Sequence, residues 1–171
     1  MSTRAANRVT VVEPGADPRP LGPGVGVDFK IHGDHTGGAL SIVEHPFEVG
    51  ALVPPHIHTV EDEISIVLDG EMGFRSNEQE VVLGPGGYIV KPRGEVHAMW
   101  NAGRVPARII EIITPAGFEG YFEELSDAVA SGEFDMGTVV GLAQRYQLPF
   151  AEPDWLPDVI ARYGLTPPPA M

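Results

Sequence analysis

The sequence predicts an all-β fold, a barrel of about eight to ten strands with two or three C-terminal α-helices packed on its outside. Glycine and proline are frequent, with 21 and 17 residues among 171, and they recur at intervals typical of the turns of a many-stranded barrel. Polar and apolar residues alternate most clearly from Glu63 to Leu68, as in a half-buried strand. After Pro115 the apolar residues recur at helical spacing instead.

Composition and charge exclude several classes of function. With 43% hydrophobic residues, the chain can bury a substantial core as one domain. Its formal net charge of −13 would repel nucleic acid and anionic membranes, so neither is an expected partner. The absence of cysteine excludes disulfides and thiolate metal sites. No apolar run approaches the roughly 20 residues needed to span a bilayer, and no signal-type apolar core is found near the N-terminus, so we expect a cytoplasmic protein.

The first segment of the chain contains no sustained periodicity. Prolines and glycines interrupt any regular element, so we expect a flexible or surface-draped arm over residues 1–25, followed by the barrel over residues 26–115. A first strand is expected from Val27 to Ile31, and the loop after it contains His32 and His35. A second metal site here would need further ligands, and none lies nearby in the sequence, so both histidines are expected to face solvent.

A long strand is expected from Ala39 to Val49. Alternation along it places Val43, His45 and Phe47 on one face. The pattern leaves open whether this face, and His45 with it, lines the cavity of the barrel or lies outside.

Two histidines and a glutamate between Gly50 and Gly70 are the strongest chemical signal in the chain. His56 and His58 stand two residues apart, so on an extended strand both imidazoles leave the same face. Glu63 lies five residues after His58, which is an odd step. A connection over residues 59–62 must therefore intervene before the carboxylate can face the two histidines.

His97 completes a candidate ligand set, because it follows the Pro92-Arg93-Gly94 turn on a further strand. Three imidazoles and one carboxylate suit one divalent transition metal, namely iron, manganese, nickel, cobalt, copper or zinc. On a six-coordinate ion, four protein ligands leave two positions open for water, substrate or dioxygen, so such a site can do chemistry. The alternative is a metal-free barrel in which these four are ordinary core or surface residues.

The strand from Glu63 to Leu68 presents two different faces. The Glu63 face is expected to line the cavity, which leaves Ile64, Ile66 and Leu68 pointing out of the barrel. An apolar row of this kind needs a cover, either the C-terminal helices or another subunit. We therefore expect a homodimer, with cover by the helices of the same chain as the alternative.

Further strands are expected over residues 72–75, 80–83, 88–90, 97–101 and 107–114. Met99 shares a face with His97, so it either lines the cavity or packs in the core. Glu111 interrupts an isoleucine-rich strand, and a solvent-facing or ion-paired carboxylate is expected in preference to a pocket residue.

The helical extension is expected over residues 116–171. A first helix should run from Gly117 to Ala130. Asp135 should cap a second helix, and a third can run from Pro153 to Tyr163.

The two histidine-containing stretches carry a family resemblance. The first runs from Gly50 through His56-x-His58 and Glu63 to Gly70, and the second runs from Gly86 through Pro92-x-Gly94 and His97 to Asn101. Both patterns resemble, without a departure, the two motifs of the cupin superfamily. The resemblance implies a double-stranded β-helix (jelly-roll) barrel. It also implies a metal held by His56, His58, Glu63 and His97.

A narrower resemblance rests on softer motifs. Asp34-x-Thr36-Gly37-Gly38 and the segment from Thr114 to Glu119 are similar to those of small, single-domain bacterial quercetin 2,3-dioxygenase-like cupins. This similarity implies a metal-dependent dioxygenase that opens the heterocycle of a flavonol-like substrate and releases carbon monoxide. Glu63 is then the catalytic residue, which ligates the metal and accepts the proton of a substrate hydroxyl.

Two other classes of function use the same kind of barrel. The first is a redox-neutral metal-dependent isomerase, cyclase, decarboxylase or lyase that acts on an oxygen-rich small molecule. The second is a non-catalytic small-molecule binder, which the intact ligand set disfavours. In every case the expected partners are a small molecule and a second copy of the chain, with dioxygen added for the dioxygenase.

Overall fold

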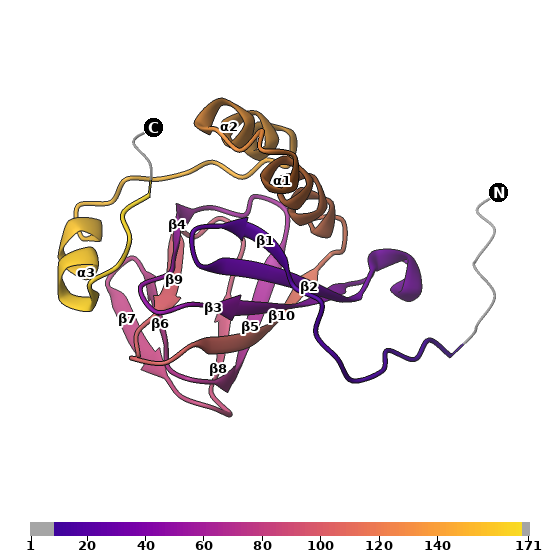
Figure 1. Cartoon of the computed structure of the whole chain (residues 1–171), viewed down its shortest axis with the longest axis horizontal. Helices are drawn as coiled ribbons and strands as arrows, with labels where there is room; N and C mark the ends of the chain where they lie inside the picture. The colour runs from indigo at the N-terminus through magenta and orange to yellow at the C-terminus, as the bar shows by residue number, and fades with distance from the viewer. Residues whose placement is uncertain (1–8, 169–171) are drawn as a thin grey trace.

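The computed structural model describes residues 9–168, in which two antiparallel sheets face each other as a barrel (Figure 1). The larger sheet has six strands in the order β1-β2-β3-β10-β5-β8, and the smaller has four in the order β4-β9-β6-β7. The strands are β1 (Arg19–Gly22), β2 (Val25–Ile31), β3 (Ser41–Phe47), β4 (Leu52–His56), β5 (Asp62–Asp69), β6 (Met72–Ser76), β7 (Gln79–Leu83), β8 (Tyr88–Lys91), β9 (His97–Asn101) and β10 (Ala107–Thr114). The helices are a 3₁₀ turn (Gly33–Thr36), α1 (Glu119–Ser131), α2 (Met136–Arg145) and α3 (Leu156–Tyr163). The expected all-β barrel with C-terminal helices is confirmed.

Each strand has an inward and an outward face, and β5 shows the rule clearly. Its Glu63, Ser65 and Val67 are buried. Ile64 and Ile66 alternate with them and are only half-buried, because they point out of the barrel. The two faces of this strand are those that the sequence predicts.

Glu111 points into the barrel. It lies in β10, where Ile109 and Ile113 on the same face are fully buried as well. The residue opposite Glu111 in β5 is Ser65, whose hydroxyl donates a hydrogen bond to it at 2.7 Å. The expectation of a solvent-facing carboxylate is therefore wrong, whereas the ion-paired alternative is correct, because Lys91 contacts it.

The interior of the barrel has an apolar end and a polar end. Strand register places Ile109 opposite Val67, and both pack with Phe47 in an apolar cluster. Further along the same pair of strands, Ile113 lies opposite Glu63. Because the apolar end is closely packed, a binding site can form only at the polar end.

Helices α1 and α2 cover the polar end. Phe118, at the start of α1, and Leu125 pack in one cluster with Val43 and Ile113, which belong to the inward faces of β3 and β10. Figure 1 shows both helices side by side above this part of the barrel. The helices therefore close the barrel at one end rather than covering its outward apolar row.

Helix α3 packs on the outer face of the smaller sheet. Val159 of this helix clusters with Leu52 and Trp100, and the Trp100 ring lies 5.3 Å from the ring of Tyr163. The expected cover of the outward row of β5 by helices is thus not found, since α3 lies beside β7 and β9 (Figure 1). Among the described residues, no helix combines the length and the apolar character that crossing a membrane requires.

The N-terminal segment joins the sheet earlier than the sequence suggests. Strand β1 lies within the expected arm of residues 1–25 and pairs with β2, with Arg19 opposite Val27. Residues 9–18 are exposed, form neither helix nor strand, and extend away from the barrel (Figure 1). Residues 1–8 of the expected arm lie outside the described residues.

Candidate metal centre

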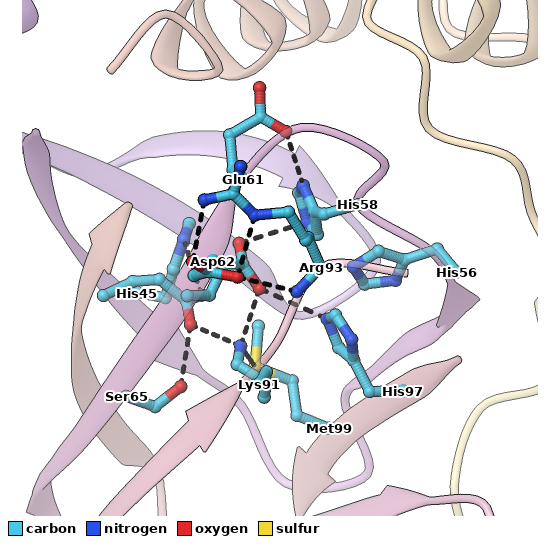
Figure 2. Close-up of polar contacts among 12 residues, drawn as sticks. His45, His56, His58, Glu61, Asp62, Ser65, Lys91, Arg93, His97 and Met99 are labelled. Carbon is cyan, nitrogen blue, oxygen red and sulfur yellow. Dashed lines mark hydrogen bonds and ion pairs between the residues drawn. The ribbon is translucent and has the colours of Figure 1, made fainter. Parts of the chain in front are cut away.

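Four side chains converge at the polar end of the barrel. His56 ends β4, His58 follows in the next loop, Glu63 lies near the start of β5 and His97 opens β9. All four are buried, and their candidate ligand atoms lie within 4.8 Å of one another. The structure thus brings together every ligand that the sequence nominates. Figure 2 shows three of them, the histidines His56, His58 and His97, close together.

The connection between the sheets explains how these residues meet. β4 belongs to the smaller sheet and β5 to the larger one, so residues 57–61 cross between them. The turn before β9 is fastened to this crossing, because the N–H of Gly94 donates to the carbonyl of His58 at 2.8 Å. Asp62 accepts hydrogen bonds from the backbone N–H of Arg93 at 2.9 Å and from its guanidinium at 2.8 and 3.1 Å. These bonds hold the two ligand-bearing segments against each other.

The Nδ1 atom of each of the three imidazoles has a hydrogen-bond partner. Nδ1 of His56 and Nδ1 of His97 lie 2.7 and 3.2 Å from the carbonyl oxygen two residues earlier. Nδ1 of His58 lies 3.4 Å from a carboxylate oxygen of Glu61. Because these oxygens only accept hydrogen bonds, each Nδ1 carries a proton and each Nε2 is the atom left for a metal. This is the arrangement that metal-binding histidines usually have, so the residues fit one divalent ion.

The charges of the ligands are set by their neighbours. Burial and the imidazoles of His97 and His58 lower the pKa of His56 well below its usual value, so this ring is neutral. Burial alone would raise the pKa of Glu63, but Lys91 and His58 outweigh burial and hold this pKa well below its usual range. Burial likewise acts to lower the pKa of His58, but nearby carboxylates, Glu63 first, raise it to about 9. A metal that binds Nε2 of His58 therefore displaces a proton.

Lys91 is a site residue that the sequence does not nominate. Its ammonium lies 2.9 Å from Oε2 of Glu63 and also pairs with Glu111. In strand register Lys91 stands directly opposite Glu63, at the end of β8. The sequence signal for an inward-facing Lys91 is its spacing of two residues from Ile89, which puts both side chains on one face of this strand. This signal is normally overruled, because lysine is rarely buried and is therefore assigned to solvent.

A cavity of about 570 Å³ opens from the candidate metal centre toward the helices. Its lining includes His45, Met99 and Glu111 as well as three of the four ligands. The sequence does not decide whether His45 and Met99 line the cavity, and it disfavours Glu111 as a pocket residue. The structure places all three on the cavity wall. Most of the remaining wall is apolar and includes Phe118, Phe122, Leu125, Val139, Leu148 and Phe150. The cavity therefore suits a ligand with an apolar body and polar groups that reach the metal centre.

His32 and His35 lie apart from this centre, as expected. The His32 side chain is 37% exposed, and its Nδ1 lies 3.6 Å from a Glu123 oxygen. His35 is 34% exposed and lies 3.6 Å from Asp34. Within residues 9–168, neither belongs to a group of side chains placed to hold a metal.

The comparisons with known proteins agree with this architecture. Residues 44–113 match the family model described as "Cupin domain". KdgF from Halomonas sp. has a similar structure, with a TM-score of 0.55 and 23% identity, over 61% of this chain and 92% of that chain. The chain thus has a mostly β cupin fold, to which three C-terminal helices are added.

Two proteins are similar to the chain in sequence over part of their length. The chain is 38% identical over 76 residues to germin-like protein subfamily T member 2 of Arabidopsis thaliana, covering 42% of this chain and 34% of the relative. It is 26% identical over 93 residues to quercetin 2,3-dioxygenase of Bacillus subtilis, covering 54% of this chain and 27% of the relative. The chain spans less than half the length of either relative. Its buried group of three histidines and one glutamate is consistent with one metal ion.

Proposed function

We propose that the protein is a metal-dependent cupin enzyme that uses dioxygen to open the heterocycle of a flavonol-like substrate. The observation that carries the proposal is that four candidate ligand side chains lie together at one end of an apolar cavity of about 570 Å³. A flat, largely apolar molecule with adjacent oxygen atoms complements both features. The likeness to the Bacillus subtilis quercetin 2,3-dioxygenase over 54% of the chain supports this assignment.

The residues of the chain have separate tasks in this proposal. His56, His58, His97 and Glu63 would hold a divalent transition metal, which supplies Lewis acidity and dioxygen activation. Glu63 is ionised and can accept the proton of a substrate hydroxyl, provided that this hydroxyl is itself acidic, because the pKa of Glu63 is low. The ring of Phe118 lies 4.4 Å from the ring of His58 and helps to exclude water.

Dioxygen consumption tests the proposal. The protein would be loaded separately with iron, manganese, cobalt, nickel and copper, and each form mixed with a panel of flavonols. We expect uptake coupled to loss of flavonol absorbance and to release of carbon monoxide with at least one metal. The His56→Ala variant, treated identically, is the control for free metal in solution. Absence of uptake with every fully loaded metal would overturn the dioxygenase assignment.

A redox-neutral isomerase, cyclase, decarboxylase or lyase is the second candidate function. The observation that favours it is the group of ionisable side chains on or beside the cavity wall, His45, Lys91 and Glu111, all of them buried. Proton-transfer chemistry needs such groups, whereas dioxygen activation does not. Product formed from an oxygen-rich substrate under strictly anaerobic conditions would select this candidate.

A further inference from the structure

His45 presents an unpartnered nitrogen to the cavity. It lies in β3, it is 1% exposed, and its Nδ1 is 2.7 Å from the carbonyl oxygen of Gly26. Because a carbonyl oxygen only accepts a hydrogen bond, Nδ1 must carry the proton. Burial lowers the pKa of His45, although Glu111 opposes this effect, so the ring is neutral and Nε2 is a bare acceptor. Within the described residues, Nε2 has no hydrogen-bond partner.

Glu111 presents an unpartnered oxygen to the same space. Its Oε1 accepts hydrogen bonds from the hydroxyl of Ser65 at 2.7 Å and from the ammonium of Lys91. Its Oε2 is buried and has no partner in the described part of the chain.

The two unpartnered atoms face each other, because Nε2 of His45 lies 3.7 Å from Oε2 of Glu111. Two acceptors at this separation repel, and each buried acceptor without a donor destabilises the unliganded protein. Both side chains line the cavity, so a ligand can reach them. What the pair lacks is two hydrogen-bond donors, one for each atom.

We propose that His45 and Glu111 form a subsite for two adjacent hydroxyl groups of the ligand, as found on a catechol ring. One hydroxyl donates to Nε2 of His45 and the other to Oε2 of Glu111. Lys91 contacts both Glu111 and the metal ligand Glu63, so one ammonium group separates the subsite from the metal centre. A single molecule can therefore occupy both places. This last point rests on the proposed function, whereas the subsite itself does not.

Nitrogen NMR of His45 tests the subsite directly. Zinc-loaded protein labelled with ¹⁵N-histidine would be titrated with catechol and, separately, with guaiacol, which has a methoxy group in place of one hydroxyl. Comparison with the His45→Asn variant identifies the His45 signals. We expect protonated Nδ1 and unprotonated Nε2 in the free protein, and an Nε2 shift with catechol that guaiacol does not produce. Protonated Nε2, or identical responses to the two phenols, would overturn the subsite.

The affinities of three flavonols that differ only on the pendant ring test whether the subsite serves the proposed function. Quercetin has two adjacent hydroxyls on its pendant ring, kaempferol has one, and isorhamnetin has one hydroxyl and one methoxy group. Zinc-loaded protein should bind quercetin about tenfold more tightly than the other two, which is the effect of one hydrogen bond to a charged acceptor. His45→Asn should remove this preference, because asparagine can still donate to Gly26 but offers nothing at the position of Nε2.

Phe122→Leu is the control for simple packing. The ring of Phe122 lies 5.0 Å from the ring of His45, so this variant should weaken all three flavonols equally and keep the preference. Failure of all flavonols to bind, combined with a catechol response at His45, would overturn the proposed substrate and keep the subsite. Equal affinity of the wild-type protein for the three flavonols would show that the subsite holds no ligand hydroxyls and would overturn its role in flavonol binding.

Discussion

Lys91 joins two buried carboxylates that would otherwise repel. Its ammonium pairs with Glu63 and Glu111, and all three side chains are at most 3% exposed. Burial would lower the pKa of Lys91, but Glu111 and Glu63 outweigh it and raise the pKa, so the lysine is charged. The candidate ligand Glu63 is therefore held by a cation on one side and by imidazoles on the other.

Replacing Lys91 by methionine should destabilise the metal-free protein by about 3–5 kcal/mol, because two carboxylates are left buried without a cation. Zinc should then stabilise the variant more than the wild-type protein, since the ion supplies the missing positive charge beside Glu63. Thermal unfolding with and without zinc measures both effects. Adding Glu111→Gln to the variant should restore part of the stability. An equal gain from zinc in the variant and the wild-type protein would contradict this reading.

Glu63→Ala and His56→Ala should have different consequences. Without Glu63 three imidazoles remain as ligands, so metal content should fall less than in His56→Ala, yet turnover should be abolished because the proton acceptor is gone. Metal analysis of the purified variants and dioxygen uptake are the two measurements. Equal and complete metal loss in both variants would remove any separate role for Glu63 as a base.

The sequence predicts the four candidate ligands that the structure brings together, but not the residues around them. His56 and His58 are identified because their spacing of two puts both rings on one face. Lys91 and Glu111 could not be placed in this way, because a charged residue in a strand is assigned to solvent unless a partner is known. Their partners come from other strands, and register between strands is a property of the folded barrel.

At the scale of the elements, two connections position the site. The crossing from β4 to β5 contains His58, and the turn after β8 contains Arg93 and leads to His97. Asp62 fastens one connection to the other through the backbone and the guanidinium of Arg93. Hydrogen bonds from Arg93 hold the pKa of Asp62 at about 2, below its ordinary value of 3.8.

The stability that Asp62 contributes should depend on pH. Because its pKa is lowered in the folded protein, the contribution is complete above pH 3.8 and is lost as the pH falls toward 2. Asp62→Asn should therefore destabilise the protein near neutral pH, and the difference from wild type should shrink below pH 3.8. Urea unfolding over a series of pH values measures this. A difference that persists unchanged in acid would contradict it, and Asp34→Asn, at an exposed position, should show no comparable effect.

The helices show what an element's own sequence can and cannot predict. Apolar spacing predicts a helix over residues 117–130, and α1 runs from Glu119 to Ser131. The cap of α2 is also as predicted, since Asp135 accepts a hydrogen bond from the N–H of Thr138 at 2.7 Å. The spacing shows which face of α1 is buried but not which surface covers it, so the position over the polar end of the barrel could not be predicted.

At the scale of the whole molecule, the outer face of the larger sheet carries an apolar row that no element within residues 9–168 covers. Ile112 lies opposite Ile42 on one side and Ile64 on the other, and Ile64 lies opposite Val90. Val90 is 63% exposed, and Tyr88 beside it is 68% exposed. No charged residue interrupts this row. Two copies of the chain can bury this row against each other across a two-fold axis, so we propose that they form a dimer through it.

Light scattering should give a mass of twice 18.3 kDa for the wild-type protein. Tyr88→Glu combined with Val90→Glu should give a monomer, because two charges are placed in the apolar interface. Both residues are exposed in the single chain, so the substitutions should leave its fold intact. Val105→Glu, at an apolar position that is 58% exposed and outside this row, is the control and should remain a dimer. A wild-type mass of one chain would contradict the proposed dimer.

We propose that the polar end of the barrel holds one metal ion on His56, His58, Glu63 and His97. Anomalous diffraction from crystals grown with cobalt tests it most directly. We expect one strong peak per chain, about 2.0–2.2 Å from the three Nε2 atoms and from a Glu63 oxygen. A peak elsewhere, or no peak in crystals of protein that binds cobalt in solution, would show that these four residues do not hold the metal.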